Sequence, residues 1–251
     1  MKRLGMAGWV IVVMSLGLLL VNCGGVSEGD KAGTSGLEAP GDLETLSNDA
    51  SMKSQPHYQH LEILSSSYIQ NAGDTSEQPV RGDAKIIYSR YTGQVSPRYS
   101  DYDIYKYESS FDLIKIANNS TGKMASCYLI TELEDGDYCL AICNPSDPNE
   151  IVWEENPILI DFKIFEVGAT HYSNSSFEKD SLTVLAKEYV PIDNIKYPAW
   201  KIYEISTDEV LSVEEYRWVN PKYGILKIQT TMTSIEDGSV IFLDAVLREY
   251  H

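Results

Sequence analysis

The feature that most constrains this fold is a series of short β-prone runs, separated by turn sequences, from residue 84 to the C-terminus. The runs are rich in Ile, Tyr, Phe and Val, which favour pleated sheet. No long amphipathic helical pattern lies among them. The expected strands are 84–91, 104–107, 111–117, 124–133, 137–143, 158–167, 181–190, 199–207, 212–219, 224–233 and 240–250. About ten short strands predict a mostly β protein, in which an antiparallel sheet forms a barrel, half-barrel or sandwich.

The segments between these runs carry turn chemistry. Asp135-Gly136, the stretch 220–224 and Asp237-Gly238 combine residues of two kinds. Gly tolerates a positive φ, and Asn, Asp or Pro preset a bend. The last two expected strands therefore form a hairpin.

Alternation along the strands indicates which face is buried. In the run 199–207, Trp200 and Ile202 point to one side of the sheet and Lys201 to the other. The segment 59–70 admits two interpretations, because its apolar residues lie near helical spacing and a strand fits nearly as well.

The first 25 residues predict export. Lys2 and Arg3 precede an apolar run, 4–21, which closes on Cys23 and two glycines. A basic start, an apolar middle and a small-residue exit are typical of a bacterial export signal. An uncleaved membrane anchor is the rival interpretation, since a run of this length sits at the lower edge of what spans a bilayer.

The segment Leu20-Val21-Asn22-Cys23 resembles the lipobox of bacterial lipoproteins. The resemblance implies that Cys23 is acylated, with palmitate among its fatty acids, and becomes the mature N-terminus. It also implies a place in the cell envelope, outside the cytoplasm. In a cell with two membranes, the glycine after the cysteine implies the outer one, with the protein facing the periplasm or the cell surface.

Three regions follow from this reading of the chain. Residues 1–22 are the signal peptide, residues 23–56 are the lipidated cysteine with a disordered tether, and residues 57–251 are a single β-rich domain. The tether is rich in Gly, Ser, Ala, Asp and Glu, a composition that cannot bury enough apolar surface to stay ordered.

The formal net charge of −17 becomes −19 when Lys2 and Arg3 leave with the signal peptide, which holds no acidic residue. Such a balance argues against binding nucleic acid through a basic face. It is compatible with cations, with basic partners or with solubility alone.

Three cysteines remain after Cys23. If a turn with a Gly bulge pairs Leu133 with Asp137, Cys127 falls opposite Cys143 and the two can form a disulfide. A two-residue turn would shift the register by one and remove the pairing. In the disulfide-bonded arrangement Cys139 is left unpaired. Its spacing from Cys143 does not fit a zinc site, so no metal site is expected.

The segments 188–202 and 216–227 resemble a pattern in uncharacterised periplasmic lipoproteins. In that pattern a Val-Pro turn leads into one strand, and a Trp-bearing strand runs into a Gly turn. Those families are similar to the open β-half-barrels of lipoprotein carriers. The resemblance implies a lipid or other apolar ligand, with Trp200 and Trp218 as candidate contacts. Both residues also suit a structural core.

The catalytic motifs of serine hydrolases, zinc proteases and phosphate-binding loops are absent from the sequence. We therefore expect no catalytic residues and no cofactor. Two functions remain: a membrane-anchored protein that binds a lipid or apolar ligand in the concavity of its sheet, or a structural or interaction lipoprotein of the envelope. A carboxylate-based hydrolase is a distant third.

Overall fold

The computed structural model describes residues 41–49, 57–172, 179–207 and 209–251. The predicted signal peptide and Cys23 lie outside these residues. The described part of the chain is almost entirely antiparallel β, as the sequence predicts, with thirteen strands in one sheet. Among the described residues, no helix has the length and apolar character to cross a membrane.

The strands are β1 (Tyr58–Ile63), β2 (Tyr68–Gln70), β3 (Gln78–Arg90), β4 (Tyr105–Lys115), β5 (Thr121–Glu132), β6 (Gly136–Asn144), β7 (Asp147–Phe162), β8 (Thr170–Tyr172), β9 (Lys179–Ile192), β10 (Ile195–Thr207), β11 (Leu211–Asn220), β12 (Gly224–Ser234) and β13 (Val240–Tyr250). The two runs expected at 104–107 and 111–117 are one continuous strand, β4. The segment 59–70 contains most of β1, a turn and β2, so the strand interpretation is right there and the helical one is wrong.

The sheet consists of two meanders joined by the first strand. Its order is β7-β6-β5-β4-β3-β1-β13-β12-β11-β10-β9-β8, and β2 bridges β3 and β13 off this path. β1 pairs with β3 on one side and with β13 on the other. The earliest strand in the chain therefore lies at the centre of the sheet and pairs with the last.

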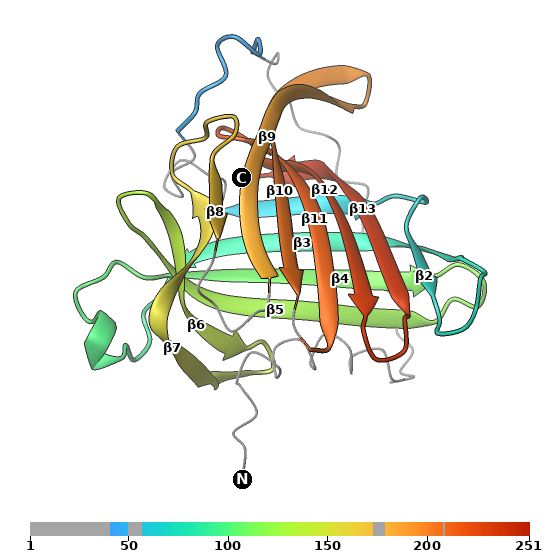
Figure 1. Cartoon of the computed structure of the whole chain (residues 1–251), viewed down its shortest axis with the longest axis horizontal. Coiled ribbons are helices and arrows are strands. Elements are labelled where there is room, and N and C mark those ends of the chain that lie inside the picture. Colours follow the sequence, from blue (N-terminus) through green and yellow to red (C-terminus); the bar gives the residue numbers. More distant parts are fainter. Residues whose placement is uncertain (1–40, 50–56, 173–178, 208) are drawn as a thin grey trace.

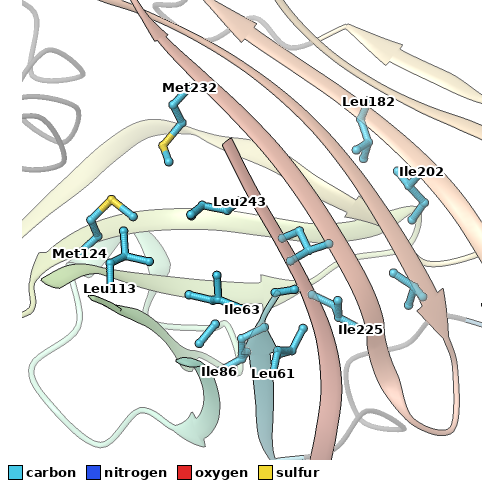
Figure 2. Close-up of a cluster of buried hydrophobic side chains, with 14 of the residues drawn as sticks. Leu61, Ile63, Ile86, Leu113, Met124, Leu182, Ile202, Ile225, Met232 and Leu243 are labelled. Carbon is cyan, nitrogen blue, oxygen red and sulfur yellow. The ribbon is translucent and has the colours of Figure 1, made fainter. Parts of the chain in front are cut away.

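The sheet folds over so that its two halves face each other. In Figure 1, β9–β13 cross in front of β3–β5. Buried aliphatic side chains from both halves fill the space between them. Figure 2 shows Leu113 and Met124 from one half lying opposite Met232 and Leu243 from the other. Burying this single continuous face is the main driving force for the fold.

A polar contact fixes the turn between β11 and β12. Gly224 adopts φ +73°, as expected for a tight reversal that favours glycine. Gln59 of β1 is fully buried, and its Nε2 donates to the carbonyls of Tyr223 and Ile225 at 2.8 and 3.1 Å. A side chain at position 224 would collide with this glutamine.

Cys127 and Cys143 form a disulfide that joins β5 to β6. The predicted pairing is right, but the predicted register of the turn is wrong. Cys139 lies opposite Ile130 rather than Thr131, and a bulge at Leu140 inserts one residue before Cys143. A bulge of this kind shifts the ladder by one position, which restores the alignment that the disulfide needs.

The disulfide lies outside the main core. Its two cysteines pack in a separate cluster beneath the 3-10 turn Pro97–Tyr99, with Tyr99, Ile104 and Leu129. Cys139 is buried and free, and burial raises the pKa of its thiol to about 12.

We predict that the double substitution Cys127→Ala/Cys143→Ala lowers the free energy of unfolding by about 3 kcal/mol, because the link closes a short loop in the unfolded chain. Urea unfolding of the purified protein measures it. Cys139→Ala is the matched control, since it removes a buried sulfur but no cross-link. An equal loss in both variants would contradict the prediction.

Candidate functional site

The two candidate ligand contacts do not share a site. Trp200 is 3% exposed and packs in the main core, whereas Trp218 is 6% exposed and packs in a second cluster. Trp218 pairs across the ladder with Lys201, the chain neighbour of Trp200, so the two indoles lie on opposite faces of the sheet. The Trp218 indole donates to Glu188, and Lys201 lies over its ring.

A largely buried arginine connects the two halves of the sheet. Arg217 projects from β11 into the concave side, and its guanidinium lies 3.5 Å from Asp161 Oδ2 of β7. It also donates to the carbonyl of Ile160 at 3.3 Å. Two further carboxylates complete the group, Glu204 at 3.0 Å and Glu215 at 3.3 Å.

The electrostatics of this group depend on the one cation. Glu204 and Glu215 are directly opposite in the ladder between β10 and β11, an arrangement that repels unless a cation intervenes. Burial alone would lower the pKa of Arg217, but Asp161, Glu204 and Glu215 together raise it. The arginine therefore stays charged and neutralises part of the carboxylate charge that surrounds it.

Three tyrosines line the concave face beside Arg217. Tyr88, Tyr107 and Tyr128 lie in one row across β3, β4 and β5, with ring centroids 5.0 and 6.0 Å apart. Burial, with the charge of Glu215 next, raises the pKa of Tyr107 to about 12. All three side chains remain partly accessible, so this end of the concave face is less completely filled than the main core.

Asp161, a member of the Arg217 group, also forms a carboxyl pair with Asp137 on the neighbouring strand. Asp137 of β6 pairs across the ladder with Asp161 and is 5% exposed, and its Oδ1 has no hydrogen-bond partner in the described part of the chain. Burial, reinforced by Asp161 and Glu132, raises the pKa of Asp137 to about 8. Asp137 is thus protonated at neutral pH. Within the described ranges, no three His, Cys, Asp or Glu side chains form a metal-binding group.

A small cavity lies on the other side of the sheet, against the disulfide. Its volume is about 250 Å³. Its two basic lining residues are both engaged, Arg90 with Asp103 and Lys106 with Glu108. The other lining residues are Ser89, Tyr91, Thr92, Gly93, Leu129, Cys143 and Ile151. Both basic residues of the cavity are therefore already paired with carboxylates, and neither is free to bind an anionic ligand.

The structure places part of the predicted tether against the β domain. In residues 41–49, Leu46 packs against the main core, and Asn48 accepts a hydrogen bond from the backbone of Phe165 at 2.8 Å. The indole of Trp200 donates to the carbonyl of Ser47 at 2.8 Å. Figure 1 shows this segment in blue, at the top of the view.

The contacts of this segment had little signal in the sequence. Its composition is that of a tether, and its partners bind mainly backbone carbonyls, which every residue carries. Arg217 was missed for another reason, since a single Arg on a strand gives no sign of which distant carboxylate it meets. Trp200, one of the two predicted ligand contacts, does donate a hydrogen bond, but its acceptor is Ser47 in the chain's own segment 41–49.

No family model, curated protein or solved structure matches this chain.

We predict that Arg217→Met lowers the free energy of unfolding by about 3–5 kcal/mol, because it leaves Asp161, Glu204 and Glu215 together without their cation. Urea unfolding at pH 7 measures the loss. Arg90→Met is the matched control, since Arg90 pairs with Asp103 at the surface and little change is expected there. Similar losses in both variants would show that the Arg217 ion pairs do not stabilise the sheet more than a surface ion pair does.

A pH dependence follows from Asp137. Its pKa is about 8 in the folded state and about 4 in an unfolded chain. Between these values the folded protein holds a proton that the unfolded chain has released, so this contribution to stability falls as pH rises.

We therefore expect Asp137→Asn to change stability little at pH 5 and to raise it by about 1–3 kcal/mol at pH 9, where the wild type buries an unpaired charge. Unfolding at both pH values tests this, with exposed Asp101→Asn as the control. Equal effects of Asp137→Asn at both pH values would contradict it.

Proposed function

We propose that this chain is a lipoprotein of the bacterial cell envelope, held in a membrane through acylated Cys23, whose β domain acts by docking to envelope proteins. The lipobox-like sequence before Cys23 supports the anchor. The observation that carries the docking function is a group of exposed apolar side chains at one edge of the sheet.

We call this group the edge patch. It comprises Ile164, Val167, Tyr172, Leu185 and Tyr189. They come from β8, β9 and the loop between β7 and β8, and the exposed fraction reaches 75% at Tyr172. Hydrogen bonds between Val184 and the backbone of Gly168 and Ala169 hold this loop beside β9. Exposed apolar side chains that gather along a sheet edge are one mark of a protein interaction site.

The strand at this edge is itself incompletely paired. β9 pairs with β10 along its whole length, but β8 covers only 181–183 on the other side. In the part of the chain that the structure describes, no strand pairs with 185–192 on that free side. Free strand edges readily accept another chain, so the edge patch and the free backbone together suit a protein partner.

A second candidate function is the binding of a lipid or other apolar ligand on the concave face. The partly accessible row of Tyr88, Tyr107 and Tyr128 favours it, together with the neighbouring Ile142 and Ile158. Against it, the rest of the concave face is filled by the main core, and Arg217 crosses the space between the halves. Docking is therefore the better supported of the two.

The remaining parts of the proposal follow from the sequence. With a mature charge of −19, the domain suits neutral or basic protein surfaces and not nucleic acid. We propose no cofactor, no metal and no catalytic role. The likeness to lipoprotein carriers remains a prediction.

A photo-crosslinking amino acid in place of Tyr172 tests the proposal in the cells that make the protein. We expect a crosslink to an envelope protein from position 172 and none from position 116, where Ile116 is also exposed but lies away from the edge patch. We also expect palmitate incorporation that Cys23→Ser abolishes. The same crosslinks at both positions would count against docking, and absence of palmitate against the anchor.

A further inference from the structure

Three hydrogen-bond donors from three elements bind three consecutive backbone carbonyls of the segment 41–49. Lys187 Nζ of β9 contacts the carbonyl of Leu46 at 3.5 Å, and the indole of Trp200 in β10 contacts that of Ser47 at 2.8 Å. The backbone N–H of Phe165 donates to Asn48 at 2.8 Å. Donors arranged in this way recognise an extended backbone whatever its side chains are.

Two side-chain positions add selectivity. Leu46 is half-buried against the main core, which favours an aliphatic residue there. Four residues earlier, the carboxylate of Asp42 accepts a hydrogen bond from the Tyr189 hydroxyl at 3.0 Å. We call the strip of β9, β10 and the loop between β7 and β8 that contacts this segment the groove. Its contacts favour an acidic residue, then an aliphatic one four positions later.

The groove is more rigidly built than the segment that occupies it. Trp200 is 3% exposed, and Lys187 lies 4.4 Å over its ring, so the two donors support each other. By contrast, every residue of 41–49 is exposed except Leu43 and Leu46, which are half-buried. A segment with so little buried surface opens at low free-energy cost.

We infer that this groove is a peptide-recognition site, which residues 42–49 occupy in cis with a turn at 42–45 followed by a straighter stretch. A partner protein enters it with a segment of the same pattern. The inference deepens the proposed function, since Tyr189 belongs to both the groove and the edge patch. It names the partner's contribution: a segment with an acidic residue in a turn and an aliphatic residue after it, which displaces the chain's own.

The cis segment competes with a free peptide because it is tethered, although it opens easily. A short linker holds it near the groove at an effective concentration in the millimolar range, so a free peptide binds poorly to the wild type. A change that releases the segment without altering the groove unmasks the site. Leu46→Asp does this, because Leu46 belongs to the segment and not to the groove wall.

The test uses the full chain purified in detergent and a fluorescent synthetic peptide of residues 41–49, with fluorescence anisotropy as the readout. We expect the peptide to bind L46D protein at least about tenfold more tightly than wild type. A peptide that itself carries Leu46→Asp should not bind. A peptide with Ser47→Ala should bind as well as the original, because Trp200 contacts only the carbonyl at this position.

A double-mutant cycle tests the contact between Tyr189 and Asp42. In the L46D background, Tyr189→Phe should weaken the peptide about fivefold, the effect of one hydrogen bond to a carboxylate. It should have no effect on a peptide with Asp42→Ala. Tyr189 is largely exposed, so this substitution leaves the core intact.

Hydrogen exchange at the Phe165 amide shows whether the segment has left the groove. If this amide stays protected in the L46D protein, a variant that lacks residues 41–49 takes the place of L46D in the same assay. Failure of the peptide to bind a protein whose Phe165 amide is exposed would overturn the inference, and so would equal binding of the two Leu46 peptides. Neither result depends on acylation of Cys23 or on the crosslinks from position 172, so the proposed function stands or falls separately.

Discussion

The contact between Arg217 and Asp161 is the polar interaction that fixes how the two halves of this sheet face each other, beside the apolar core they share. The main core already draws β9, β10 and β11 over the other half of the sheet, and Phe162 brings the end of β7 against it. Beside this core, the largely buried charge of Arg217 requires a counter-charge and finds it in Asp161 on the facing half. The strength of this brace comes from the low dielectric of the interior, where an unpaired ion is far more costly than at the surface. The brace also explains why carboxylates can cluster on the concave face at all.

The two faces and the edge of the sheet thus have different roles. The concave face is divided between an apolar core and the tyrosine and arginine group, and the opposite face carries the disulfide cluster. The free edge at β9 is where apolar side chains, unpaired backbone and the N-terminal segment meet. Because the same segment leads back toward Cys23, its release from this edge would lengthen the stretch of chain that is free between the domain and the proposed anchor.

Local features of the fold could be predicted from the sequence, and distant contacts could not. Turn residues such as Gly224, and the alternation of Trp200 with Lys201, act within a few residues and leave a readable pattern. The bulge at Leu140 left none, because a ladder can gain a residue without any change in composition. The bend of the sheet and the meeting of Arg217 with Asp161 depend on packing between halves, which no local pattern encodes. For the groove, the decisive atoms are carbonyl oxygens, and these are invisible in a list of side chains.

The central position of β1 has a consequence for how the protein reaches its native state. This strand is the first of the domain to leave a ribosome or an export channel, yet one of its two neighbours, β13, is the last. Until the C-terminus emerges, β1 can pair only with β3. The β8–β13 meander then has no strand through which it can join the rest of the sheet. Such long-range closure folds slowly, so the nascent chain exposes strand edges throughout its passage. A chain truncated before residue 240 would therefore never complete its sheet and would be a natural substrate for proteases and chaperones.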